Sequence, residues 1–234
     1  MNQLILDFAD NAYPDSAAFL GNSNHQLREV LQSKHEAFVY VWDGEVAFGR
    51  DENSGAASIV LKAWAAEMQK KGYAVMCINA AVISEQRQLA DDAVFSQDAV
   101  VIGNIDYLDA ANQHRLFELF NHFRNRASGQ LLLSAAVPPA GLTVREDLRT
   151  RLAYCLVYEL KPLNDEEKAE ALMQIANAWQ IPVDRDVFRY LLQYGPRDWG
   201  SLMTILLRIS HDTLQYRRRV TLPLIRELLQ QEVP

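Results

Sequence analysis

Short, continuous apolar runs recur along the chain as far as Pro162 and predict five buried strands. They are rich in Val, Ile, Leu and Tyr, as strands covered on both faces tend to be. The five runs are Ala37–Trp42, Tyr73–Asn79, Ala99–Asn104, Gln130–Ala135 and Tyr154–Leu160. Between them lie segments with apolar residues at helical spacing, such as Ser58–Lys70 and His114–Arg126. Strands that alternate with helices of this length predict a parallel sheet built by right-handed crossovers.

After Pro162 the pattern changes, and every periodic segment is helical. Asn164 is a good N-cap residue, and the acidic run Asp165–Glu167 suits the first turn of a helix. The predicted helices are Asp165–Trp179, Asp184–Tyr194, Asp198–Tyr216 and Leu222–Gln231. We therefore expect an α/β domain over residues 11–162, followed by a small all-helical domain over residues 163–234.

Composition is that of an ordinary globular protein, with 49% hydrophobic and 23% charged residues in 234. The mean hydropathy is -0.15, and no apolar run approaches the roughly 18 residues that span a bilayer. The N-terminus lacks the features of a signal peptide, so we expect a cytoplasmic protein that has no membrane partner. Cys77 and Cys155 lie inside apolar runs without a CxxC pair, and we expect both to be small core side chains.

Charge argues against strong direct binding to DNA. The chain carries 23 Lys and Arg against 30 Asp and Glu, a net charge of -7. A protein that grips DNA unaided usually presents a basic face. The one basic run, Arg217–Arg219, suits a solvated helix end. The histidines are scattered without the spacing of a metal pair, so we expect no metal site.

The turn after the first predicted strand is where such a fold would bind phosphate. It contains Gly49 and Gly55 but no Gly-Lys-Ser/Thr motif, because Ser58 follows Ala57 rather than a lysine. The loss of one charge-assisted contact is worth roughly 1.5–3 kcal/mol. Four acidic residues, Asp43, Glu45, Asp51 and Glu52, add charge that opposes a polyphosphate.

The end of the third predicted strand gives a second test of nucleotide binding. In ATPases of this type, the strand ends in an aspartate that positions Mg²⁺. Here Gly103 and Asn104 stand at that place, and Asp106 lies further along the chain. We interpret Asp106 as a turn or cap residue.

Several segments resemble the Hda family, relatives of the AAA+ ATPase domain of the bacterial initiator DnaA. Asp147–Leu152 and Leu160–Lys168 are similar to the D-L-x-S-R-L and L-x-P-L-x-D-x-x-K run that joins the ATPase core to its helical lid. Ser134–Pro139 resembles the sensor-one strand end and its Pro-Pro loop, and residues 3–8 resemble a short sliding-clamp-binding peptide. The resemblance covers nearly the whole chain. It implies an AAA+-like domain with a five-stranded parallel sheet, followed by a small helical lid domain.

The resemblance also implies a role in regulating the initiation of chromosomal replication. Family members bind the DNA polymerase sliding clamp through the N-terminal peptide, here residues 1–10, and then stimulate ATP hydrolysis by DnaA. The clamp-binding anchors would be Gln3, Leu4, Leu6 and Phe8. Arg151 would be the catalytic group, an arginine finger supplied in trans to DnaA. The implied partners are the sliding clamp and DnaA, and a homodimer is left open.

The chain departs from the family pattern at its nucleotide contacts. Family members keep a basic residue in the phosphate turn, an acid on the third strand and a sensor-two arginine in the lid. This chain has Ala57, Gly103 and Gly200 at those positions. We therefore expect a degenerate nucleotide site, no cofactor and no ATPase activity of its own. The residues of that site are Gly49, Gly55, Ser58, Gly103 and Gly200.

Two other interpretations remain open. The chain could be a nucleotide-binding AAA+ protein with a variant phosphate loop, in which Arg50 replaces the lysine and ADP is a ligand. It could also be an adaptor that binds the clamp or DnaA without any effect on hydrolysis.

Overall fold

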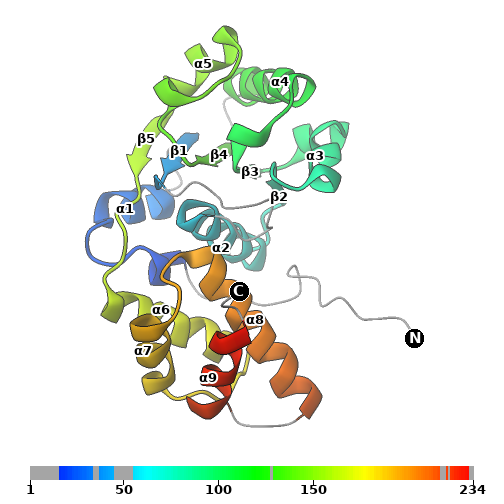
Figure 1. Ribbon diagram of the computed structural model, residues 1–234. Helices are drawn as coiled ribbons and strands as arrows, with labels where there is room; N and C mark the ends of the chain where they lie inside the picture. Colours follow the sequence, from blue (N-terminus) through cyan, green and yellow to red (C-terminus); the bar gives the residue numbers. More distant parts are fainter. Residues whose placement is uncertain are drawn as a thin grey trace.

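A computed structural model describes residues 16–33, 37–44, 55–126, 129–216, 220 and 222–231 of the chain. Five parallel strands form one sheet in the order β2-β3-β4-β1-β5 (Figure 1). The strands are β1 (Phe38–Trp42), β2 (Val75–Asn79), β3 (Ala99–Gly103), β4 (Gln130–Ala135) and β5 (Leu156–Glu159). Each lies where its apolar run predicted it.

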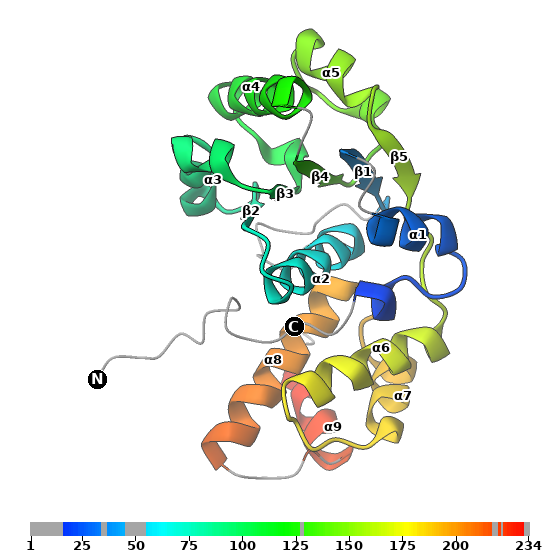
Figure 2. The same ribbon diagram turned by 180° about the vertical axis from the view of Figure 1, so that it is seen from behind.

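Helices cover both faces of the sheet, which explains why the strand sequences are apolar on both sides. Figures 1 and 2 show α1 (His25–Ser33) and α2 (Ala56–Lys70) on one face. The other face carries α3 (Ile83–Leu89), α4 (Ala110–Arg126) and α5 (Glu146–Leu152). Side chains of β1 alternate between the two cores: Val39 and Val41 pack towards α1 and α2, and Tyr40 packs towards α4.

The hydrophobic pattern located α2 and α4 but not the three shorter helices. α3 and α5 have seven residues each and α1 has nine, so none repeats its apolar face often enough to show a helical period. Short 3-10 turns complete the α/β part at Ser16–Phe19, Asp92–Ser96, Ile105–Tyr107 and Pro139–Gly141.

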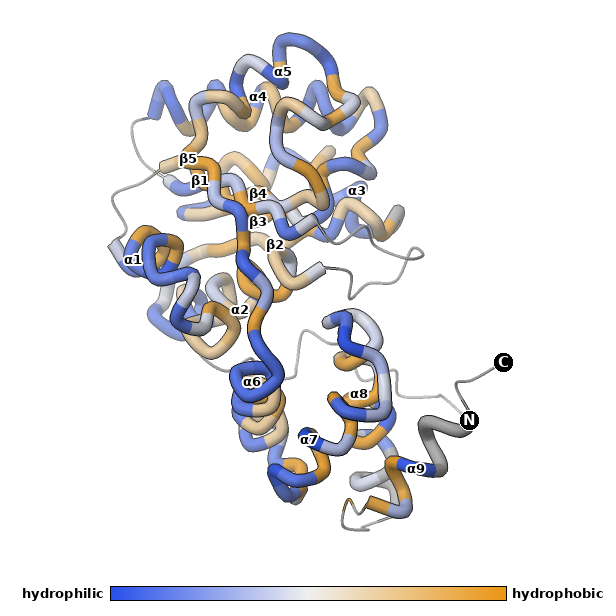
Figure 3. Tube along the Cα trace, turned by 60° about the vertical axis from the view of Figure 1, so that its left-hand side comes forward, coloured by the Kyte–Doolittle hydropathy of each residue, from blue (hydrophilic) through white to orange (hydrophobic). Residues whose placement is uncertain are grey.

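The segment after β5 forms a helical lid, as its sequence predicted. Its helices are α6 (Asp165–Ala178), α7 (Arg185–Tyr194), α8 (Trp199–Tyr216) and α9 (Leu222–Gln231). The Asn164 side chain accepts a hydrogen bond from the Glu167 amide at 2.9 Å, and Glu167 accepts one from the Asn164 amide at 3.1 Å. This capping box fixes the start of α6. In Figure 3 the sheet strands are largely hydrophobic, whereas the face of α6 in front is hydrophilic.

Residues near the described N-terminal end hold the lid connection in place. The Asn24 amide group donates to the carbonyl oxygens of Leu20 and Lys161, at 2.7 and 2.9 Å, and its oxygen accepts from the Lys161 amide at 2.7 Å. Phe19 packs edge-on against Trp199 of α8, with ring centroids 5.8 Å apart. The strand-to-lid linker is therefore pinned by buried hydrogen bonds and by an aromatic contact.

Both cysteines are free thiols in apolar surroundings, as expected. Burial raises the pKa of Cys77 to about 11 and that of Cys155 to about 12. Within the described ranges, none of the helices combines the length and the hydropathy that a membrane span requires.

Candidate functional site

The N-terminus of α2 lies beside the carboxyl end of β1, the place where a nucleotide phosphate would bind in this kind of fold. The Asp43 side chain, which directly follows β1, accepts a hydrogen bond from the Ala57 amide at 2.8 Å. Gly55 precedes the helix with φ +85°, and a Cβ there would lie 3.0 Å from the Asp43 carboxylate. A carboxylate of the chain itself thus occupies the anion position at the start of α2.

Removal of the Asp43 carboxylate is expected to weaken the start of α2. Asp43→Ala should lower the free energy of unfolding by about 1–2 kcal/mol, because the Ala57 amide loses its charged acceptor. Asp43→Asn keeps an oxygen acceptor and should lose less. Urea unfolding of the three proteins measures the difference, and a variant with alanine that is as stable as the parent would contradict this role.

Gly103, at the end of β3, leaves no room for an acidic side chain. The residue is buried, and a Cβ placed on it would collide with the Oγ atom of Ser58 on α2. The Oγ atom of Ser134, at the end of β4, would lie 3.5 Å from that Cβ. Ser58 is 4% exposed and Ser134 is fully buried, so small hydroxyl groups fill the space that a magnesium-binding carboxylate would need.

Neutral amides complete the polar groups at these strand ends. Asn104 adopts a left-handed conformation with φ +57°, and its side-chain nitrogen donates to Oδ1 of Asn79 at 2.8 Å. The Asn104 amide donates to Ser134 Oγ at 3.3 Å, and the Ala81 amide donates to the same Asn79 oxygen at 3.1 Å. These groups satisfy one another inside the protein, where an unpaired polar atom would be costly.

Asp106 lies in the turn Ile105–Tyr107, in agreement with its interpretation as a turn residue. Burial raises the pKa of its carboxyl group, and hydrogen bonds with the backbone at Asp106 and Ala136 act in the opposite direction. Elsewhere in the described part of the chain, no group of three His, Cys, Asp or Glu side chains is arranged to hold a metal ion.

The lid closes over the same region and leaves little space. A cavity of only about 10 Å³ lies between the lid and the α/β part, with Asp43, Leu163, Lys168 and Trp199 among its lining residues. That volume is about what one water molecule requires. Gly200 follows Trp199 in the first turn of α8, so the start of α8 faces this region without a guanidinium group at that position.

Two cationic side chains of the lid, Lys168 and Arg197, bind other groups of the lid. Lys168 is buried, with 8% of the residue exposed. Its ammonium group donates a hydrogen bond to the Arg197 carbonyl oxygen at 2.6 Å. The Arg197 guanidinium group forms an ion pair with Asp165 at 2.6 Å. Both contacts hold lid elements together.

The described residues do not fit a nucleoside triphosphate with Mg²⁺. The predicted residues Gly55, Ser58 and Gly103 do come together, but around a carboxylate and two hydroxyl groups of the protein itself. Gly49 and Arg50 lie outside the described residues, as does the predicted clamp-binding set Gln3, Leu4, Leu6 and Phe8. From the sequence, Asp43 was expected only to add negative charge that opposes a phosphate group. The structure shows that its carboxylate contacts the start of α2 directly.

A separate surface forms where α5 packs against α4. Arg151 lies in the last turn of α5, partly exposed, and its guanidinium carbon is 5.5 Å from the centre of the Phe117 ring on α4. Among the described residues, no carboxylate pairs with Arg151. The contact with Phe117 is a cation–π interaction, which uses none of the N–H donors of the guanidinium group.

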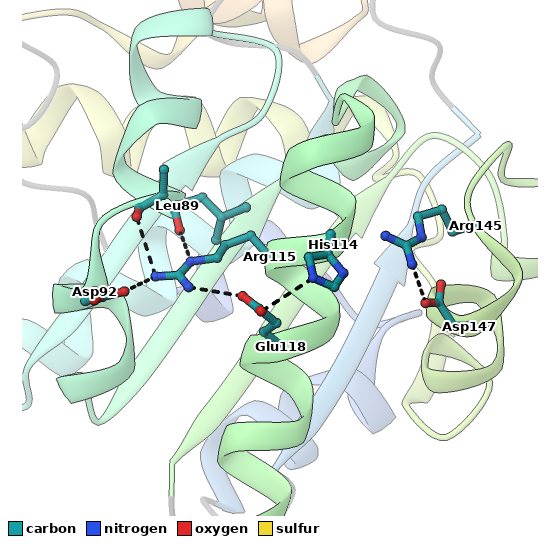
Figure 4. Close-up of polar contacts among 8 residues, drawn as sticks. Leu89, Asp92, His114, Arg115, Glu118, Arg145 and Asp147 are labelled. Atoms are coloured by element: carbon teal, nitrogen blue, oxygen red, sulfur yellow. Dashed lines mark hydrogen bonds and ion pairs between the residues drawn. The ribbon is translucent and has the colours of Figure 1, made fainter.

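Neighbouring arginines on the same helices contrast with Arg151. Figure 4 shows Arg115 held by Asp92 and Glu118, and Arg145 held by Asp147 at 2.8 Å. Multiple hydrogen bonds to carboxylates raise the pKa of Arg115 further, against the effect of desolvation. At the seam between α4 and α5, Arg151 therefore has no carboxylate partner among the described residues, whereas Arg115 and Arg145 are paired. The resemblance had singled out Arg151, but Phe117 as its support was not foreseen.

Comparisons with known proteins support the lid and the fold. Residues 165–229 match the family model described as the Hda lid domain. Domain III of the replication initiation protein DnaA from Thermotoga maritima has a similar fold, with a TM-score of 0.66 and 16% identity over 93% of this chain and 95% of that one. AMPPCP-bound DnaA from Aquifex aeolicus gives a TM-score of 0.59 and 16% identity over 90% of this chain and 66% of that one.

A more distant functional class shares the fold as well. The Holliday junction branch migration motor RuvB of Thermotoga maritima gives a TM-score of 0.59 and 13% identity over 94% of this chain and 72% of that one. The five-stranded parallel sheet followed by a helical lid is therefore an AAA+-like fold, shared with domain III of DnaA. The lid is more specific, because over residues 165–229 the chain is Hda-like.

Proposed function

We propose that this chain regulates the initiation of chromosomal replication by stimulating ATP hydrolysis in DnaA, without an ATPase activity of its own. The Hda-type lid and the DnaA-like fold support a DnaA-related replication regulator. The observation that carries the finer proposal is the guanidinium group of Arg151 at the end of α5, which contacts Phe117 and has no carboxylate partner among the described residues. It is combined with a nucleotide region in which a carboxylate of the chain, Asp43, binds the start of α2, and Ser58 fills the space beside Gly103.

Chemistry favours Arg151 as the group that acts on a partner. A guanidinium ion remains charged at all physiological pH values, and its planar fork matches the oxygens of a phosphate group. Offered to the γ-phosphate of a neighbouring ATP, it stabilises the charge that develops in the transition state of phosphoryl transfer. The α5 helix is short and lies on the surface, so Arg151 can reach a neighbouring molecule without rearrangement of the sheet.

The proposal assigns one task to each part of the chain. Residues 1–10 bind the sliding clamp, residues 11–162 form the AAA+-like domain that presents Arg151, and residues 163–234 form the lid. Asp43 at the start of α2 replaces a nucleotide phosphate in stabilising that helix, so the fold does not depend on ADP or ATP. No cofactor is part of the proposal.

The direct test is hydrolysis of ATP bound to DnaA. ATP-loaded DnaA is incubated with DNA-loaded sliding clamp, with and without this chain, and formation of ADP is followed. We expect faster hydrolysis only when the chain is present. Binding to DnaA without acceleration would favour the adaptor, and a rise in the melting temperature of the chain alone with ADP would favour a nucleotide-binding protein.

Clamp binding is tested separately at the N-terminus. Leu4→Ala combined with Phe8→Ala should abolish retention of the chain on immobilised clamp, because a peptide of this kind binds through apolar anchors in a groove. Asn2→Ala combined with Asp7→Ala is the matched control and should bind as the parent does. Circular dichroism should be the same for all three. Undiminished binding of the Leu4 and Phe8 variant would remove the clamp from the proposal.

A further inference from the structure

One short segment near the described N-terminal end contacts both parts of the molecule. It runs from the 3-10 turn Ser16–Phe19 to Asn24, the residue before α1, and we call residues 16–24 the strap. Figure 2 shows its turn, in blue, between α2 of the α/β part and α6 of the lid, and the turn packs against both helices. Phe19 and Leu20 are buried in a hydrophobic core that contains side chains of both parts.

Two polar contacts hold the strap on the α/β part. The Oγ atom of Ser16 donates a hydrogen bond to Oε2 of Glu67 on α2 at 3.4 Å. The guanidinium group of Arg28 on α1 donates to the Gly21 carbonyl oxygen at 2.6 Å. Because α1 follows the strap directly in the chain, the position of the strap is set by the same helices that cover the sheet.

The same strap is attached to the lid at separate places. The Asn22 amide donates to Oε1 of Glu167 on α6 at 3.1 Å, while Oε2 of that carboxylate serves the capping box. Phe19 packs on Trp199 of α8, and Asn24 binds both backbone polar groups of Lys161 in the linker. These contacts reach two lid helices and the linker, so a swing or a rotation of the lid would break several of them together.

Gly21 marks a close approach between the strap and the lid. Its φ angle is +53°, a conformation that favours glycine. A Cβ at this position would lie 2.6 Å from Cδ2 of Leu163 and 2.9 Å from Oε1 of Glu167. A side chain at Gly21 would therefore push the start of α6 away from the strap.

We infer that the strap fixes the orientation of the lid against the α/β part, so that this orientation does not depend on a bound nucleotide. The cavity of about 10 Å³ beside Phe19 and Trp199 has room for about one water molecule. The lid is therefore joined to the α/β part by groups of the protein itself. The inference concerns the chain alone and goes beyond its proposed effect on DnaA.

The distance between two spin labels measures the orientation of the lid in the whole chain. Asn125→Cys on α4 and Gln193→Cys on α7 place one label on an exposed position of each part, in a parent protein whose two native cysteines are replaced by alanine. We expect one narrow distance distribution that is unchanged by ADP or by ATP with Mg²⁺. A distribution that shifts with either nucleotide would overturn the inference.

Gly21→Ala should shift or broaden this distribution, because its methyl group meets Leu163 and Glu167. Gly72→Ala is the matched control. Gly72 also has a positive φ angle, +87°, but a Cβ there meets no atom of the described residues within 4 Å. The control carries the same kind of backbone strain without a contact with the lid, so it should give the distribution of the parent.

Asn24→Ala is a second variant, which decides the question if Gly21→Ala does not fold. It removes the hydrogen bonds of Asn24 with Leu20 and Lys161. We expect a broader distance distribution and faster amide exchange at Lys161, with the circular dichroism of the parent. If the distribution of Asn24→Ala, or of a folded Gly21→Ala protein, equals that of the parent, the strap does not fix the lid and the inference is wrong. No DnaA is present in these measurements, so their outcome is separate from that of the hydrolysis assay.

Discussion

Arg151→Ala should abolish the acceleration of ATP hydrolysis in DnaA while leaving the fold and clamp binding unchanged. An arginine supplied in trans accounts for roughly 10³–10⁵ in the rate of phosphoryl transfer in other nucleotide hydrolases. Alanine removes the only group of α5 that the proposal places on the partner's phosphate. We therefore expect the stimulated rate to fall by at least about a hundredfold, towards that of DnaA alone. Single-turnover ADP formation measures it.

Two companion variants sharpen the interpretation of that result. Arg151→Lys keeps the charge but loses the planar fork, so it should restore little of the rate. Arg145→Ala removes a guanidinium group that is paired with Asp147 and is expected to leave stimulation intact. Full stimulation by the Arg151→Ala protein would eliminate the arginine finger, whatever the effect of the other variants.

Gly103→Asp should destabilise the protein strongly and should not restore Mg²⁺ binding. The new side chain would be buried against the hydroxyl groups of Ser58 and Ser134, the atoms nearest to it, which carry no charge to compensate its own. An uncompensated buried charge costs about 3–5 kcal/mol. Gly103→Ala adds volume without charge and should cost about 1–3 kcal/mol. The free energy of unfolding in urea distinguishes the two.

A double-mutant cycle with Ser58 isolates the steric part. Ser58→Ala removes the hydroxyl group that a Cβ at position 103 would meet, so it should recover much of the stability lost in Gly103→Ala. The two changes should therefore be clearly non-additive. Additive losses would mean that Ser58 does not occupy the space in question, and the account of the missing magnesium ligand would be wrong.

The strands and the lid helices could be predicted because their apolar residues repeat over enough positions. β3 is buried along its whole length, so its sequence is a continuous apolar run. The capping residues Asn164 and Glu167 predicted the start of α6. In contrast, α5 has only seven residues and is charged at four of them, so the periodicity predicted no helix there, and the resemblance marked Asp147–Leu152 only as a motif.

The candidate site was only partly readable in the sequence. The absence of lysine before Ser58 and of an acid at Gly103 is a local fact, visible residue by residue. The groups that take their places are not local. Asp43 reaches Ala57 across 14 positions of the chain, and Ser134 reaches Asn104 across 30. Only the folded chain brings such pairs together.

The sequence by itself determined that this protein has an α/β domain and a helical lid, and that it lacks the usual phosphate and metal ligands. Residue type and periodicity suffice for the domain organisation and for the missing ligands, because both can be read from neighbouring positions along the chain. The tertiary structure decided which groups fill the nucleotide region and which arginines remain unpaired. Those outcomes depend on contacts between distant segments, such as the seam of α4 and α5, where packing brings Arg151 to Phe117 and Arg124 to Tyr154.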